Sequence, residues 1–170
     1  MLQGLAPLYA AGTRLLVLGS FPGVASLQKQ QYYGHAQNHF WKITATLLSP
    51  DASDVLAMAY AKRCDWLLEH GLGLWDVYAA CEREGSLDSN IRQAQPNDLK
   101  WLQNACPQLQ AIAHNGGESF KHAKHTQALR VPVYRLPSSS PANATWSFER
   151  KLSAWREVFV QAGLAVTASQ

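Results

Sequence analysis

The sequence RLLVLGSFPG, residues 14–23, joins a short apolar run to a turn bounded by glycine and proline. Three further runs share this character, being rich in β-forming residues or flanked by turn residues: Gly73–Tyr78, Gln110–His114 and Val131–Leu136. Apolar runs of this length between turn residues indicate buried strands. Together with Arg14–Gly19 they predict four strands.

Segments with helical character separate these strands. They cover Asn38–Leu48, Ser53–His70, Asn97–Asn104, Gly117–His125 and about Ser147–Ala162. Asn97 suits an N-cap, and Gly71 and Gly163 suit helix ends. Strands that alternate with helices form parallel βαβ units. The pattern therefore predicts an α/β fold, a three-layer sandwich with a central four-stranded parallel sheet, as a single domain over residues 1–170.

The composition is that of an ordinary globular protein. Of the 170 residues, 47% are hydrophobic and 16% are charged, which argues against disorder. The 15 Lys and Arg residues against 12 Asp and Glu give a formal net charge of +3. This mild excess permits a polyanionic partner without requiring one.

The cysteines bear on compartment and metal chemistry. Cys64, Cys81 and Cys106 form no C-x-x-C pair, which argues against a disulfide framework, a structural zinc and an iron–sulfur cluster. No apolar run reaches about 18 residues, and no early basic region precedes an apolar stretch. We expect a cytoplasmic protein that is neither secreted nor inserted in a membrane.

Loops at the carboxyl ends of parallel strands carry the working groups of such folds. Here they are Ser20–Gln37, Ala79–Asp88, Asn115–Gly117 and Pro137–Thr145. In the first, Gly19–Gly23 permits close approach of a ligand to the backbone. It is neither a Walker loop nor G-x-G-x-x-G, so nucleoside triphosphate chemistry loses its best support. A turn without a ligand explains it equally well.

The same loop continues through YYGHAQNHFW, residues 32–41, which is dense in aromatic rings and amides. Aromatic faces stack on bases, and amides present a donor and an acceptor to a base edge, so the stretch predicts a base pocket. Two alternatives stay open. Phe40 and Trp41 suit the core face of an amphipathic helix, and Asn38 suits its N-cap.

Two later strands also end in polar loops. Asn115 follows a buried strand and would face the shared crevice, although a turn-forming Asn-Gly is an alternative interpretation. Between Pro137 and Pro141 lie three serines, whose hydroxyls suit phosphate oxygens. A generic polar loop is the alternative there.

Other chemistries have weaker support. A metal site at His114, His122 and His125 lacks an H-E-x-x-H pattern and a carboxylate partner. Cys81 suits an inert thiol better than a nucleophile. The loop acids show no pairing by spacing that would indicate a two-carboxylate mechanism; they are Asp76, Asp88 and Glu118.

Two stretches together resemble the uracil-DNA glycosylase superfamily, and most nearly its hypoxanthine-DNA glycosylase branch. They are GSFPGVASLQKQQYYGHAQNHFWKI, residues 19–43, and LPSSSPANA, residues 136–144. The first begins like the family's strand-end loop at the scissile bond, and the second resembles the loop that enters the minor groove. Members that process uracil usually carry Asp or Asn in the first motif, whereas this chain has Ser20 and Phe21. By position, the resemblance implies that Asn38 is the catalytic residue.

The resemblance implies a uracil-DNA glycosylase-like fold and a monofunctional DNA glycosylase. The enzyme would flip a deaminated base out of the double helix, and the expected base is the hypoxanthine of deoxyinosine. It would then hydrolyse the N-glycosidic bond with a water molecule oriented by Asn38. No acidic group would act near the bond. The base contacts would be Gly19, Ser20, Phe21, Tyr33 and Asn115, and the DNA contacts Pro137, Ser138, Ser139, Ser140, Pro141 and Asn143. We expect a monomer that acts on DNA without a cofactor or metal.

Three other functions stay open. A mismatch-type uracil or thymine glycosylase fits the Asn-x-Phe-Trp pattern but not Ser20-Phe21. A catalytically silent nucleic-acid-binding module would keep the pocket without the chemistry. A protein that binds small nucleotides or nucleosides would lack the phosphate motifs usual for that task.

Overall fold

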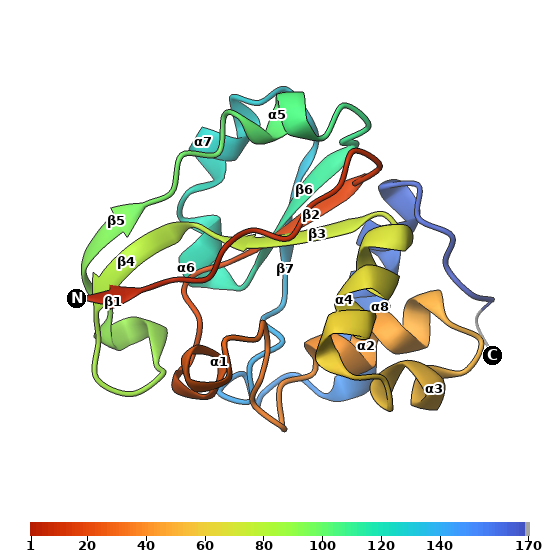
Figure 1. Cartoon of the computed structure of the whole chain (residues 1–170), viewed down its shortest axis with the longest axis horizontal. Coiled ribbons are helices and arrows are strands. Elements are labelled where there is room, and N and C mark those ends of the chain that lie inside the picture. Colours follow the sequence, from red (N-terminus) through yellow and green to blue (C-terminus); the bar gives the residue numbers. More distant parts are fainter. Residues whose placement is uncertain (169–170) are drawn as a thin grey trace.

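Four parallel strands form the central sheet of the computed structural model, which describes residues 1–168 (Figure 1). They are β2 (Leu15–Gly19), β3 (Leu72–Asp76), β6 (Ala111–Asn115) and β7 (Val133–Leu136), in the order β3-β2-β6-β7. Gly19 pairs with Asp76 and Asn115 with Leu136, so the carboxyl ends of the strands lie along one edge. The predicted fold class is confirmed.

Helices cover both faces of this sheet (Figure 1). They are α1 (Val24–Lys29), α2 (Phe40–Leu48), α3 (Ala52–Leu56), α4 (Tyr60–Glu69), α5 (Leu102–Ala105), α6 (Gly117–Phe120), α7 (Ala123–Gln127), α8 (Phe148–Gln161) and the 3₁₀ turn η1 (Asp88–Asn90). Leu15 and Val17 pack in one apolar cluster with Trp155 of α8, whereas Leu16 and Leu18 pack in a second with Leu102 of α5. Burial on both faces explains why β2 is a continuous apolar run.

The chain after β3 contributes to a second, antiparallel sheet that the sequence did not predict. Its order is β1 (Leu2–Gln3), β4 (Tyr78–Glu82) and β5 (Arg92–Pro96). Residues 79–88 were expected to form a loop, but β4 occupies the first part of them. The strand β5 was missed because its sequence, RQAQP, is polar. An edge strand pairs through its backbone groups and needs no apolar side chains.

Helix boundaries account for the other errors. The helix predicted over Ser53–His70 is two helices, α3 and α4, separated where Ala59 is extended with ψ of 149°. The Gly117–His125 helix is likewise divided into α6 and α7. Asn97 follows β5 instead of capping a helix, and its Nδ2 donates to the Asp76 carbonyl at 2.9 Å. The helix predicted over about Ser147–Ala162 is confirmed as α8, and Ser147 caps it by accepting a hydrogen bond from the Arg150 N–H.

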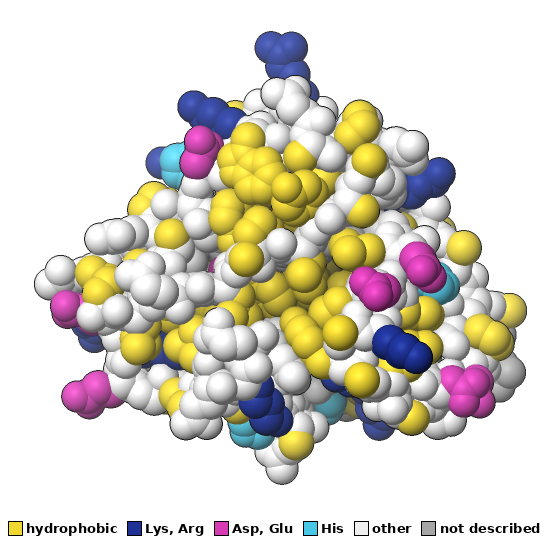
Figure 2. Space-filling model, viewed as in Figure 1, with side chains coloured by type: hydrophobic (Ala, Val, Ile, Leu, Met, Phe, Trp, Pro, Cys, Tyr) yellow, Lys and Arg dark blue, Asp and Glu magenta, His cyan; other side chains and the backbone are white. Residues whose placement is uncertain are grey.

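Hydrophobic side chains reach the surface over the middle of one face, with most charged groups toward its periphery (Figure 2). Among the partly exposed aromatic residues, Tyr9 and Trp101 pack edge to face with ring centroids 5.2 Å apart. No helix within residues 1–168 combines the length and apolar character needed to cross a bilayer.

Candidate functional site

A cleft of about 720 Å³ lies at the carboxyl edge of the parallel sheet, and every candidate site residue lines it. They are Gly19, Ser20, Phe21, Tyr33, Asn38, Asn115, Pro137, Ser138, Ser139, Ser140, Pro141 and Asn143. These residues follow β2, β6 and β7, whose parallel pairing brings their ends together. The cleft therefore unites segments that are far apart in the sequence.

Asn38 lies just before α2 and has two roles available to it. Its Oδ1 accepts a hydrogen bond from the Phe40 N–H at 2.9 Å, as a residue at a helix start does. Its half-buried side chain also lines the cleft. The N-cap residue of α2 is His39 and not Asn38, and the bond to Phe40 fixes how the Asn38 amide is oriented on the cleft.

Asn115 fastens the loop after β7 to the end of β6. Its Nδ2 donates to Ser139 Oγ at 2.9 Å and to Tyr33 Oη at 3.2 Å, and its Oδ1 accepts from the Ser139 N–H at 3.0 Å. Both amide hydrogens are therefore used within the protein. To contact a base as the resemblance implies, the Asn115 amide would first have to exchange one of these bonds.

The two rings expected to stack on a base differ in their surroundings. Tyr33 adopts a positive φ of 54°, and its ring stacks on Phe40 at a centroid distance of 4.1 Å. One face of Tyr33 is thus covered by the protein. Phe21 is 6% exposed and packs in the second apolar cluster. Tyr32 is held in the core by donating to the Ala6 carbonyl at 2.7 Å.

The serine-rich loop is held in shape by its own side chains. Ser138 Oγ accepts from the Ser140 N–H at 3.1 Å, and Ser140 Oγ accepts from the Ala142 N–H at 3.2 Å. In both bonds the hydroxyl is the acceptor, so its own hydrogen is left for an external acceptor. Asn143 Nδ2 donates to the Ser138 carbonyl at 3.1 Å.

A buried lysine of α8 donates a hydrogen bond to the backbone of this loop. Lys151 is 1% exposed, and its Nζ donates to the Ser140 carbonyl at 3.3 Å and lies 3.2 Å from His39 Nδ1. The His39 N–H donates to the Ser139 carbonyl at 3.0 Å. The serine loop therefore has a defined position relative to α2 and α8.

Two of the loop acids, which showed no pairing by sequence spacing, both line the cleft. Asp76 ends β3 and is 5% exposed, and Asp88 accepts a hydrogen bond from Ser20 Oγ at 2.7 Å. Burial and then the neighbouring Asp88 raise the pKa of Asp76 to about 7, and burial raises the pKa of Asp88 as well. Two acidic groups therefore lie on the cleft, where no role for an acid was expected from the sequence. The available signal was the position of Asp76 at a strand end.

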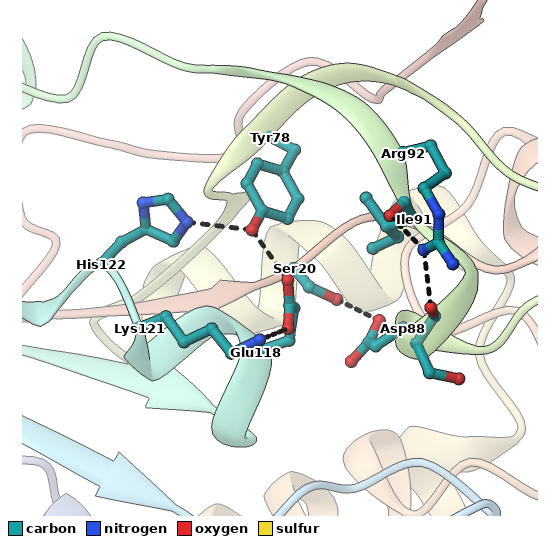
Figure 3. Close-up of polar contacts among 9 residues, drawn as sticks. Ser20, Tyr78, Asp88, Ile91, Arg92, Glu118, Lys121 and His122 are labelled. Carbon is teal, nitrogen blue, oxygen red and sulfur yellow. Dashed lines mark hydrogen bonds and ion pairs between the residues drawn. The ribbon is translucent and has the colours of Figure 1, made fainter.

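Beside Asp88 lies a second polar network, drawn in Figure 3. Tyr78 Oη donates to Glu118 Oε1 at 2.9 Å and lies 3.0 Å from His122 Nε2, while Lys121 forms an ion pair with Glu118 at 2.6 Å. These residues border the site on the side of β4 and α6.

The alternatives based on histidine and cysteine are not favoured by the geometry. Both ring nitrogens of His114 are bonded at 2.8 Å, one to Ser119 and the other to Thr126. Within residues 1–168, no group of three His, Cys, Asp or Glu side chains is arranged to hold a metal ion. Cys81 is fully buried, and burial raises the pKa of its thiol, which disfavours the nucleophilic thiolate.

A second groove of about 810 Å³ adjoins the cleft and shares Asn38 with it. Its basic lining residues are Lys29, His39, Lys42, Arg63 and Lys151. No Asp or Glu lines it. The groove therefore offers a positive surface that continues from the cleft along α2.

Comparison with known proteins points to a single family. Residues 6–161 match the model of the uracil DNA glycosylase superfamily. Proteins named hypoxanthine DNA glycosylase in Methanosarcina barkeri and Methanosarcina acetivorans are 34% and 36% identical to this chain over 157 residues, 92% of this chain and 97% of each relative. A solution NMR structure of a proposed uracil DNA glycosylase from Methanosarcina acetivorans matches with a TM-score of 0.81 at 35% identity, covering 95% of this chain and 98% of that one.

The lack of room for a side chain at Gly19 gives a prediction about the stability of the protein. A Cβ at Gly19 would lie 2.5 Å from Asp76 Oδ1, so Gly19→Ala must displace the carboxyl or the strand. We expect a loss of about 1–3 kcal/mol in the free energy of unfolding, measured in urea. Gly12→Ala is the matched control, because open space surrounds that position. Equal stabilities for the two variants would contradict the tight packing at Gly19.

Proposed function

The chain belongs to the uracil DNA glycosylase superfamily, and from that premise we propose that it removes hypoxanthine from deoxyinosine in DNA. It would be a monofunctional glycosylase, with water as the attacking group. The names of the two relatives support the substrate, since each covers nearly the whole chain. The observation that carries the proposal is the cleft at the strand ends, which joins aromatic, amide and hydroxyl groups beside a basic groove.

The form of the cleft suits a nucleotide turned out of the double helix. A base stacked in a duplex cannot enter a recess, so an enzyme acting on it must flip it out at a cost of a few kcal/mol. The cost is lower for a deaminated base that pairs weakly, which adds to selectivity. The rings of Tyr33 and Phe21 supply apolar surface on the cleft wall.

Cleavage of the N-glycosidic bond develops positive charge on the sugar and negative charge on the departing base. Asn38 would orient a water molecule toward C1′ through its Oδ1, which keeps a lone pair after accepting from Phe40. A neutral amide is a weak base, but a sugar that already resembles an oxocarbenium ion needs little deprotonation of the water. Orientation is the contribution of this residue.

The basic groove would hold the DNA backbone on the side of α2. Lys42 Nζ lies 4.3 Å from the centre of the Phe148 ring, and the Arg63 guanidinium lies 4.5 Å from that of Trp41. Neither forms an ion pair with an acid within residues 1–168. Their charges are therefore available to phosphates. The serine hydroxyls would bind phosphates nearer the flipped nucleotide. All of these groups come from one chain, as a monomeric enzyme requires.

A substrate panel tests the proposal. Excess enzyme is incubated with duplexes containing one deoxyinosine, one deoxyuridine, one mismatched thymidine or no lesion, with and without free nucleotides, and abasic products are cleaved with alkali. We expect strand cleavage with deoxyinosine and little with deoxyuridine. Faster release of uracil or mismatched thymine would favour the mismatch-type function instead. Binding without base release would favour a silent module, and displacement of DNA by free nucleotides a small-molecule function.

Asn38→Ala should lower the single-turnover rate on deoxyinosine DNA at least about 100-fold, because the water loses its orientation. Loss of the bond to Phe40 should also cost about 1 kcal/mol of stability. Asn38→Ser separates the two effects, since serine keeps a capping oxygen but no amide; we expect near-normal stability and low activity. Asn104→Ala removes an exposed amide of α5 and is the control. A normal rate for Asn38→Ala would remove Asn38 from the mechanism.

Lys42→Ala should weaken binding to duplex DNA of any sequence and reduce the slope of log affinity against log salt by about 1. The reason is the loss of one phosphate contact in the groove. Lys62→Ala removes an exposed lysine of α4 that does not line the groove. Titrations at several salt concentrations compare the two. An equal slope for both variants would place the DNA backbone elsewhere.

A further inference from the structure

Asp76 carries a buried polar atom that the protein leaves unsatisfied. Its Oδ2 has no hydrogen-bond partner within residues 1–168, although the side chain is 5% exposed and lines the cleft. Such groups are costly in native proteins and call for an explanation. By contrast, the Asn115 amide on the same cleft is bonded through both of its polar atoms.

The Asp76 carboxyl lies directly against the backbone of Gly19, which is possible because Gly19 has no side chain. A Cβ at Gly19 would lie 2.5 Å from Asp76 Oδ1 and 3.5 Å from Tyr33 Oη. The carboxyl and the phenol thus lie close together at the end of β2. Gly19, Tyr33 and Asp76 all line the cleft.

The charged groups around Asp76 do not neutralise it by pairing. Asp88, in η1, is the nearby acid, and Arg83, after β4, is the nearby cation. Arg83 donates to the carbonyls of Gly85 and Pro22, each at 2.7 Å, and forms no ion pair with Asp76.

Two phenols also lie near Asp76. Tyr32 and Tyr33 precede α2, and burial raises the pKa of both, so they stay neutral. Burial and Asp88 raise the pKa of Asp76, and Arg83 lowers it, with a result of about 7. Around neutral pH a large fraction of Asp76 is therefore protonated.

We propose that Asp76 contacts the flipped purine and, as a neutral carboxylic acid, donates a hydrogen bond to it as it departs. This inference rests on the proposed function and adds a catalytic residue to it. The unsatisfied Oδ2 shows that the protein itself does not use the whole carboxyl, and the place of Asp76 on the cleft wall puts the side chain beside the bound base. The proton stays on Asp76, so the bond cleavage itself is still completed by water at C1′.

The chemistry of the base favours a neutral acid at this position. Hypoxanthine presents the O6 acceptor beside the N1–H donor, and a carboxylic acid presents an O–H donor beside a carbonyl acceptor. As the glycosidic bond breaks, its electron pair passes to the base, so a donor aimed at the base strengthens its interaction in the transition state. An ionised carboxylate would instead repel the growing negative charge. Buried carboxylic acids are known to act as donors in this way.

The location of Asp76 separates it from the water-orienting residue. Asn38 lines both the cleft and the basic groove, whereas Asp76 lines only the cleft. A DNA strand lying in the groove would thus bring its sugar toward Asn38 and its flipped base toward β3. The two side chains would act on opposite sides of the breaking bond.

The test compares pH profiles of single-turnover base release from a deoxyinosine duplex. The wild-type rate should fall about tenfold per pH unit above about 7, because Asp76 loses its proton. Asp76→Asn keeps a donor at every pH, so its rate should stay within about tenfold of the wild-type maximum and should not fall above pH 7. Asp76→Ala should lose about 100- to 1000-fold at every pH.

Two further variants serve as references. Asp54→Asn makes the same chemical change at an exposed position of α3 and should keep the wild-type profile. Asp88→Asn removes the charge that raises the pKa of Asp76, so the fall in rate should begin at lower pH.

Thermal unfolding provides a readout independent of activity. The pKa of Asp76 is higher in the folded chain than its ordinary value of 3.8, so the folded state loses stability as pH rises from about 4 to about 7, and the loss is complete above that. Above that pH, Asp76→Asn should therefore unfold at least about 2–4 °C higher than the wild type. The difference should narrow below pH 5, where the wild-type carboxyl is neutral.

Three results would overturn the inference: an unchanged fall above pH 7 in Asp76→Asn, a wild-type rate in Asp76→Ala, or equal losses in both variants. A folded wild-type protein that releases no hypoxanthine would instead reject the proposed function. In that case the unfolding temperatures would still report whether Asp76 is a buried acid.

Discussion

The parallel pairing of β2 with β3 and β6 is the constraint on which the site depends. It places Gly19 beside Asp76 and brings the end of β6 to the same edge. A slip in register by one residue would move every side chain to the other face and disrupt both apolar clusters, so the relative positions of the strand ends are strongly specified. The cleft residues therefore inherit their spacing from the packing of the core.

The two buried polar side chains at this edge differ in whether the protein satisfies their hydrogen bonds. Asn115 is fully bonded and holds Ser139 and Tyr33, which gives the loop after β7 a single position. Asp76 is left with an unsatisfied oxygen at the same depth. A fully bonded amide contributes to stability, whereas an orphaned carboxyl opposes it. Such a cost is commonly tolerated where a binding site requires it.

Hydrophobic pattern predicted the sheet because its strands are buried on both faces, so β2 and β6 stand out as continuous apolar runs. The same pattern missed β5, whose polar residues pair through the backbone alone. Recognition of Asn38 came from a motif resemblance, and the structure places it on the cleft. The closeness of Asp76 and Asp88 was not predictable from their spacing, because it depends on how the chain turns after β4 and returns through η1.

Burial lowers the negative charge of the cleft, because it raises the pKa of Asp76, and so makes two acids compatible with a polyanionic substrate. Ionised Asp76 and Asp88 together would repel phosphates and a departing anionic base, although the adjoining groove is basic. Burial raises the pKa of both carboxyls, Asp88 raises that of Asp76 further, and Asp76 is the one that takes up a proton near neutrality. Asp88 keeps the Ser20 hydrogen bond, which favours its charged form. One charge of the pair is thereby removed by the protein itself, and the neutral acid that remains is a hydrogen-bond donor on the cleft.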